Sequence, residues 1–197
     1  MWRRQQQRLD ARQSDLTMND QAPPQALLDK ARQVKVLLLD VDGVMTDGGL
    51  YVGESGEVFK RFNTLDGHGL KLLQSAGIQP VIITGRDSAA LRYRLSELSV
   101  KTAFFAVEDK RKAAQDYLDQ LHLNWAQVAA MGDDWPDLPM LIPAAVSFAP
   151  AQSHPEVLKR VHHVCKSDAG HGAVREVCDL LLKANNHYQA LLNPYLS

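Results

Sequence analysis

Cysteine is scarce in this sequence. There are two cysteines in 197 residues, too few for a disulfide framework or a cysteine-based structural zinc site. The chain also lacks an excess of charge, since 22 Lys and Arg residues face 23 Asp and Glu residues. A balanced charge provides no attraction to nucleic acid or to an anionic membrane surface, so we expect neither as a partner. A reducing, cytoplasmic location is the simplest interpretation of this composition.

Long apolar runs are absent as well. No segment approaches the roughly 20 apolar residues needed to span a bilayer, and the arginine-containing N-terminus lacks the apolar core of a signal peptide. With 45% hydrophobic and 23% charged residues, the composition is that of a folded domain and not of a disordered chain.

The sequence divides into three parts. Residues 1–33 are a polar N-terminal extension that we expect to be partly disordered, with a short helix over 25–32. Met18 is a second candidate for the translation start beside Met1. Residues 34–186 form one domain, a size that buries a sufficient core without disulfides. Residues 187–197 form a C-terminal tail.

Short apolar runs alternate with amphipathic segments in the domain. Runs typical of strands buried on both faces lie at 34–39, 80–84, 102–106, 127–131 and 145–148, with a weaker one at 162–165. Helical patterns lie at 67–75, 88–98, 110–121 and 173–182. This alternation predicts an α/β fold, a Rossmann-like parallel sheet flanked by helices on both faces.

One segment departs from the alternation. Residues 48–53 and 57–62 alternate in period two around a Glu-Ser-Gly turn, which is typical of a β-hairpin. The segment follows the first predicted strand directly, where the active-site loops of open α/β sheets lie. We therefore expect a small hairpin flap near the functional edge of the sheet, and no separate cap domain.

Acidic residues gather after two of the predicted strands. Asp40 and Asp42 follow the first strand; such a pair alone is usually an Asp-rich turn, but the apolar run before it and the glycine after it favour a functional site. Asp133, Asp134 and Asp137 follow the fourth strand and are also compatible with helix capping. Two acidic clusters at the ends of parallel strands suit an oxygen-only Mg²⁺ site. No cluster of Cys and His offers a zinc alternative.

A hydroxyl and cationic groups occupy the strand ends between these clusters. Thr84, Gly85 and Arg86 end the second strand, and Lys110 opens the helix after the third. Each is ordinary when taken alone. Together, a hydroxyl, nearby backbone N–H groups and an ammonium are what a transferring phosphoryl group requires.

In these motifs the sequence resembles the haloacid dehalogenase superfamily of phosphotransferases, over residues 34–137. The matching elements are D-V-D-G-V with a trailing T-D at 40–47, Thr84, Lys110, and G-D-D at 132–134. A closer resemblance, extending to about residue 186, is to the 3-deoxy-D-manno-octulosonate 8-phosphate phosphatases. It is carried by F-N-T-L-D-G-H-G at 62–69, I-T-G-R at 83–86 and G-H-G-A-V-R-E at 170–176.

The resemblance implies a phosphoric monoester hydrolase with Mg²⁺ as cofactor and an aspartyl-phosphate intermediate. Asp40 would be the nucleophile, and Asp42 would act as general acid and then general base. Thr84 and Lys110 would complete the catalytic set.

The implied metal ligands are Asp40, the backbone carbonyl of Asp42, and Asp133. Asp134 and Asp137 would lie behind them, with Asp134 acting through water or by holding Lys110 in place.

The implied substrate is a phosphorylated sugar acid. Residues that would bind it are Asp42, Asn63, Asp66, Gly67, Lys71, Gly85, Arg86, Arg94 and Lys110. Leu65, Lys71 and His171 stand where the family pattern leads us to expect arginine, which reads carboxylates by a bidentate fork. A sialic acid 9-phosphate is therefore an alternative substrate. A non-catalytic assembly module and phosphotransfer to an acceptor other than water are further alternatives.

The family also implies a homotetramer in which a neighbour helps to close each site, and a role in lipopolysaccharide biosynthesis. The predicted hairpin agrees with such an assembly, because it carries too many apolar side chains for a free flap: Leu50, Tyr51, Val52, Val58 and Phe59. Two-stranded ribbons are marginal alone, so several hairpins would pair around a symmetry axis. The tail is also apolar over 191–196 and would dock on its own subunit or on a neighbour.

Overall fold

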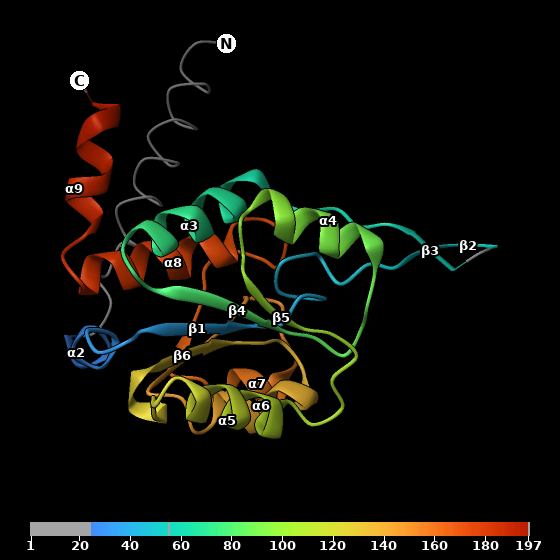
Figure 1. The fold of residues 1–197 in the computed structure, drawn as a ribbon, viewed down its shortest axis with the longest axis horizontal. Coiled ribbons are helices and arrows are strands. Elements are labelled where there is room, and N and C mark those ends of the chain that lie inside the picture. The colour runs from blue at the N-terminus through green and yellow to red at the C-terminus, as the bar shows by residue number, and fades with distance from the viewer. Residues whose placement is uncertain (1–24, 55, 197) are drawn as a thin grey trace, which may run out of the picture.

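The predicted α/β architecture is confirmed by the computed structural model, which describes residues 25–54 and 56–196. A parallel sheet lies between two layers of helices, and a small hairpin projects from one end of the molecule (Figure 1). The expectations for residues 1–24, including the disorder and the choice between Met1 and Met18, lie outside the described residues.

All six strands predicted from the apolar runs are present in one parallel sheet. They are β1 (Val36–Leu39), β4 (Gln79–Ile83), β5 (Thr102–Phe104), β6 (Val128–Met131), β7 (Val146–Ala149) and β8 (His163–Val164). The strand order is β5-β4-β1-β6-β7-β8. The chain runs outward from β1 on one side and then crosses back to β6 on the other, so the strand order reverses beside β1. In open α/β sheets, this is where ligands bind, outside the carboxyl ends of the strands.

Side chains of β1 alternate between two cores, one on each face of the sheet. Leu37 and Leu39 pack in the core under α3, α4 and α8, whereas Val36 and Leu38 pack in the core above α5, α6 and α7. The helices of the first layer are α3 (Thr64–Ser75), α4 (Ala89–Glu97) and α8 (Ala173–Ala184); those of the second are α5 (Lys110–Gln120), α6 (Leu138–Leu141) and α7 (Pro155–Leu158) (Figure 1).

The helix bounds differ from the predicted ones mainly through capping. The helix α3 begins at Thr64, three residues before the predicted start, because the side chain of Asn63 accepts a hydrogen bond from the N–H of Leu65. Three short 3₁₀ turns are also present: η1 (Trp125–Gln127), η2 (Trp135–Asp137) and η3 (Asn193–Tyr195). Within the described part of the chain, none of the helices combines the length and apolar character needed to cross a membrane.

The N-terminal helix belongs to the folded unit. The helix α2 (Gln25–Ala31) buries Leu27 and Ala31 in the core and packs against α8. The short helix predicted over 25–32 is therefore present, and it packs on the domain that was predicted to begin at residue 34. Its two buried residues lie four positions apart, which is one face of a helix.

The hairpin consists of β2 (Tyr51–Gly53) and β3 (Gly56–Phe59), which pair antiparallel. It projects away from the body of the chain (Figure 1). Tyr51 and Phe59 stack with their ring centroids 4.3 Å apart, while Val52 and Val58 are 70% and 61% exposed. The hairpin thus presents an apolar surface that residues 25–54 and 56–196 leave uncovered.

The C-terminal tail rests on its own chain. In α9 (Tyr188–Leu192), Leu191 packs partly against the main core, and the ammonium of Lys183 lies 4.8 Å from the ring centre of Tyr188. Beyond it, the ring of Tyr195 meets the edge of His68 on α3. The helix α9 thus packs on its own subunit, while Tyr195 and Leu196 beyond it are exposed and their docking on a neighbour stays a prediction.

Candidate active site

The carboxyl ends of three neighbouring strands form one cleft. Asp40 follows β1, Thr84 follows β4 and Asp133 comes two residues after the end of β6; β1 lies between the other two strands, so these side chains converge. The cleft has a volume of about 550 Å³. Its lining consists of Asp40, Asp42, Thr84, Gly85, Arg86, Val107, Glu108, Lys110, Asp133, Asp134, Pro136 and Asp137. Val107, Glu108 and Pro136 were not predicted.

The ammonium of Lys110 lies at the centre of the acidic cluster. Its Nζ donates to Asp40 Oδ1 and to Asp137 Oδ1, each at 2.6 Å, and its side chain is 5% exposed. Of the two roles predicted for Asp134, the holding of Lys110 falls to Asp137 instead, whereas action through water stays a prediction. The reason is local: Asp134 is exposed at the start of η2, whereas Asp137 at its end is buried and accepts the N–H of Asp133.

Burial and mutual repulsion govern the charges of this cluster. Burial, followed by the charges of Asp137 and Asp40, raises the pKa of Asp133 to about 8. Burial and Asp137 also raise the pKa of Asp40, against the opposing effect of Lys110. Burial disfavours the charged form of Lys110, but Asp40 and Asp137 outweigh it and raise its pKa. One ammonium therefore does not neutralise the three carboxyl groups of the cluster, of which Asp40 and Asp137 are buried and Asp133 is half-buried.

Two glycines make this crowding sterically possible. Gly43 has a φ of +83°, and a Cβ there would lie 2.2 Å from Asp133 Oδ2. A Cβ on Gly132 would lie 2.4 Å from the Cβ of Asp137. A side chain at either position would displace a carboxylate of the cluster.

Three carboxylates are arranged so that they could share a cation. Oxygen atoms of Asp40, Asp133 and Asp137 lie within 4.8 Å of one another. Oxygen-only donors of this kind suit Mg²⁺. The predicted side-chain ligands Asp40 and Asp133 are both in this group, and Asp137, predicted to lie behind them, joins it.

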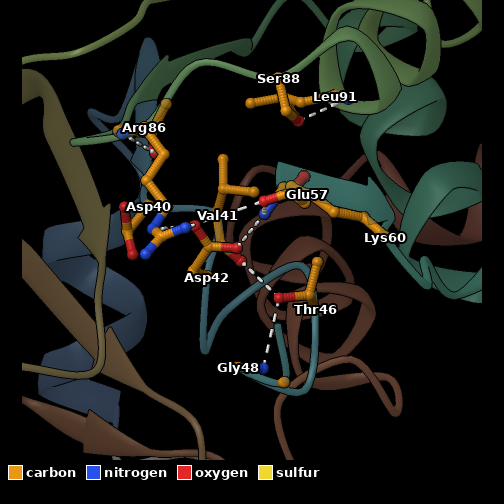
Figure 2. Close-up of polar contacts among 12 residues, drawn as sticks. Asp40, Val41, Asp42, Thr46, Gly48, Glu57, Lys60, Arg86, Ser88 and Leu91 are labelled. Atoms are coloured by element: carbon orange, nitrogen blue, oxygen red, sulfur yellow. Dashed lines mark hydrogen bonds and ion pairs between the residues drawn. The ribbon is translucent and has the colours of Figure 1, made fainter. Parts of the chain in front are cut away.

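Asp42 belongs to a separate network beside the cluster. Its Oδ1 accepts a hydrogen bond from Lys60 Nζ at 2.5 Å, and its Oδ2 lies 3.9 Å from Arg86 Nε (Figure 2). Lys60 and its second partner Glu57 come from the hairpin and were not among the predicted site residues. No residue-type signal separates Lys60 from a surface lysine, since its burial depends on how the hairpin is seated.

Thr84 is held by the turn that follows β4. Its side chain is buried, and its Oγ1 accepts the N–H of Arg86 at 3.3 Å. Its backbone carbonyl accepts the N–H of Val107, which brings the loop before α5 into the cleft. The hydroxyl and the loop amides thereby line the same cavity as Asp40.

Comparison with known proteins agrees with this site. A model of the haloacid dehalogenase-like hydrolases matches residues 107–177. The 3-deoxy-D-manno-octulosonate 8-phosphate phosphatase KdsC of Yersinia pestis is 39% identical over 160 residues, which is 81% of this chain and 86% of the relative. The chain belongs to this phosphatase family.

Solved structures of the family have the same fold. The Moraxella catarrhalis 3-deoxy-D-manno-octulosonate 8-phosphate phosphatase, in complex with magnesium, phosphate and KDO, has a TM-score of 0.83 and 32% identity, covering 86% of this chain and 97% of that one. The cobalt-bound phosphatase of Haemophilus influenzae has a TM-score of 0.81 and 36% identity, covering 85% and 99%.

Several substrate residues expected from the phosphatase family lie outside the lining of the cleft. Asp66 is 2% exposed and accepts the N–H of Arg175 at 2.8 Å, so it caps α8 from α3. Arg94 donates to the carbonyl of Asn63 at 3.3 Å and lies against Gly67, where a Cβ would be 2.3 Å from its Nη2. These four predicted residues join α3 to α4 and α8.

Lys71, the fifth such residue, is exposed on α3. Substrate binding by any of the five stays a prediction. Asp42, Gly85, Arg86 and Lys110 are the predicted substrate residues that line the cleft.

The raised pKa of Asp133 makes the stability of the metal-free protein depend on pH. The carboxyl titrates near ~3.9 in an unfolded chain and at about 8 when folded. Between these values the folded state binds more protons, so its stability falls as pH rises. We predict that Asp133→Asn raises the free energy of unfolding at pH 8 by on the order of 3 kcal/mol. The gain should vanish near pH 4.

Urea unfolding in metal-free buffer at pH 4, 6 and 8 measures this effect. Asp134→Asn is the matched control, because it makes the same chemical change at the adjacent exposed residue. An equal gain from both variants, or a gain independent of pH, would contradict the assigned repulsion.

Proposed function

We propose that this chain is a Mg²⁺-dependent phosphatase that hydrolyses 3-deoxy-D-manno-octulosonate 8-phosphate to the free sugar acid and phosphate. The observation that carries the proposal is the buried pair of Asp40 and Lys110 at the switch point of the sheet. It provides a carboxylate nucleophile beside a fixed positive charge in a cleft open to a small ligand. Relatives 39% identical over most of the chain bear this activity in their names.

The residues present fit Mg²⁺. Oxygen atoms of three carboxyl groups lie close enough together to bind one ion. When all three are ionised, the single positive charge of Lys110 does not balance their negative charge. Asp40, Asp133 and Asp137 could hold the cation, together with the predicted backbone carbonyl of Asp42. When bound, Mg²⁺ would neutralise this repulsion and withdraw charge from the phosphoryl oxygens.

In the first half-reaction, a carboxylate oxygen of Asp40 attacks phosphorus. The new bond joins that oxygen to phosphorus, and the bond between phosphorus and the sugar oxygen breaks, its electron pair remaining on the sugar oxygen. Asp42 gives its proton to that oxygen. Lys110, the hydroxyl of Thr84 and the amides after it stabilise the negative charge of the phosphoryl group.

In the second half-reaction, water attacks the phosphorus of the aspartyl-phosphate. Asp42, now a carboxylate, accepts a proton from the water as the new bond forms. The bond between phosphorus and Asp40 breaks and restores the carboxylate. Inorganic phosphate is released, and Asp42 again carries a proton for the next cycle.

The eight-carbon sugar acid is the substrate that the family supports best. Leu65 and Lys71 are exposed on α3, and His171 lies 3.1 Å from Nη1 of Arg61. Arg61 therefore offers a guanidinium near a position where the family pattern leads us to expect an arginine. Comparison of kcat/KM for the 8-phosphate and a sialic acid 9-phosphate decides between the two substrates.

A homotetramer remains part of the proposal, as do the cytoplasmic location and the role in lipopolysaccharide biosynthesis. The support for assembly comes from the apolar hairpin, in which Val52, Val58 and Phe59 are each more than half exposed. Pairing of several hairpins would remove this surface from water and cover one side of the cleft.

We predict that Asp40→Asn abolishes turnover, because an amide cannot form the covalent intermediate. The loss of kcat should exceed about 1,000-fold, as for other catalytic nucleophiles. Phosphate release from the 8-phosphate measures it, with Asp116→Asn on the exposed face of α5 as control. A variant that kept a tenth of the activity would exclude the covalent mechanism.

Removal of divalent cations should also abolish activity. We expect none in excess chelator, full recovery with Mg²⁺, and inhibition by Ca²⁺, whose longer bonds and higher coordination number misplace the phosphoryl group. Phosphate release after dialysis and metal addition measures this, and full activity in chelator would rule out a metal at Asp40.

Light scattering should report a tetramer, and Val58→Asp on the exposed hairpin should dissociate it, because several buried charges would meet at the axis. A fully active monomer would contradict the shared closure of the site.

A further inference from the structure

The hairpin buries one lysine inside the molecule. Lys60 directly follows β3, and its side chain is 2% exposed, although Phe59 before it and Arg61 after it are about half exposed. A lysine is almost never buried without a partner, since an isolated ammonium loses its hydration. Its Nζ lies 2.5 Å from Asp42 Oδ1 and 3.0 Å from Glu57 Oε2 (Figure 2).

Each aspartate of the D-V-D-G motif thus has its own buried lysine. Lys110, from α5, holds Asp40, whereas Lys60, from the hairpin, holds Asp42. Among the described residues, the other ion-pair partner of Asp42 is Arg86, which is about half exposed and more distant at 3.9 Å. Lys60 is therefore the closer contact of the Asp42 carboxyl group, and it engages Oδ1, whereas Oδ2 lies on the side of Arg86.

Glu57 anchors this lysine from within the same hairpin. Its Oε2 contacts both Lys60 Nζ and, at 3.9 Å, Arg86 Nη1. Contacts run from Glu57 through Lys60 to Asp42 (Figure 2). Because Lys60 belongs to the hairpin and Asp42 follows β1, the contact between them requires the hairpin to pack against the end of β1.

We propose that Lys60 is a positioning residue for Asp42. It fixes the carboxyl group that moves the proton at the leaving oxygen, and it makes that orientation depend on the seating of the hairpin. The inference rests on the proposed function, because it gives Asp42 the general acid and base role. A proton donor must lie within hydrogen-bond reach of its acceptor, and a misplacement near 1 Å costs about 100-fold in rate.

The chemistry separates this role from substrate binding and from folding. A sugar alkoxide needs a proton as it leaves, whereas 4-nitrophenolate is stable without one. Formation of the aspartyl-phosphate from 4-nitrophenyl phosphate therefore needs Asp40 but does not need an oriented Asp42. Hydrolysis of that intermediate needs Asp42 again, because a proton must leave the attacking water.

The experiment compares Lys60→Met, which keeps the length of the side chain, with wild type and with Lys60→Arg, which keeps the charge. For the sugar acid 8-phosphate, Lys60→Met should lower kcat about 100-fold and change KM less than about threefold. With 4-nitrophenyl phosphate and Mg²⁺, the same variant should release a burst of one nitrophenolate per site and then turn over slowly. Lys60→Arg should restore most of kcat. Lys112→Met, at an exposed lysine of α5, is the control.

Other outcomes overturn the inference. Wild-type kcat in Lys60→Met would show that Asp42 needs no such support. A raised KM with unchanged kcat would make Lys60 a substrate ligand, and loss of both the burst and turnover would make it structural. If Lys60→Met does not fold, Glu57→Gln replaces it and should lower kcat about fivefold to tenfold with the burst retained; unchanged kcat there also overturns the inference. Failure of the proposed function gives different results. Either the wild type hydrolyses neither the sugar acid 8-phosphate nor 4-nitrophenyl phosphate, or Asp40→Asn still releases the burst of nitrophenolate.

Discussion

Two buried carboxyl groups and a half-buried one, crowded beside a single ammonium, are the constraint on which this site depends. The ammonium of Lys110 contacts Asp40 and Asp137, and Asp133 stands beside them, so like charges are held together at the end of the sheet. Such an arrangement is unfavourable by itself, as the raised pKa of Asp133 indicates. The rigid parallel sheet imposes it, and the repulsion provides the free energy with which a cation or a phosphoryl group with its metal would be bound.

The two aspartates of the first motif are made different by their surroundings. Asp40 lies in the buried cluster at the end of β1, whereas Asp42 turns to the hairpin and to Arg86. A nucleophile must approach phosphorus, and an acid must approach the leaving oxygen on the opposite side. Lysines from two different elements contact these two carboxyl groups, so under the proposed mechanism their surroundings would give two roles to one residue type.

The hairpin connects the site to the outer surface of the chain. Its inner end carries Lys60 and Glu57, and its outer part exposes Val52 and Val58. Contact of the apolar outer part with another subunit would also hold the inner end against Asp42. Assembly and proton transfer would then both depend on how the β2–β3 hairpin packs against the end of β1. In a small domain without a cap of its own, the same element would then serve both closure and orientation.

Apolar periodicity determined the sheet, the helices on both faces and the hairpin, because these patterns act locally and alternate with fixed periods. The positions of Asp40, Thr84, Lys110 and Asp133 at the ends of elements also followed from the sequence, since parallel strands end at one edge. Other contacts required the tertiary structure. Asp137 rather than Asp134 holds Lys110 because of the turn of η2. Asp66 caps α8, and Lys60 reaches Asp42, through packing between segments distant in the chain. Such contacts depend on how helices and a hairpin are seated, which no local period encodes.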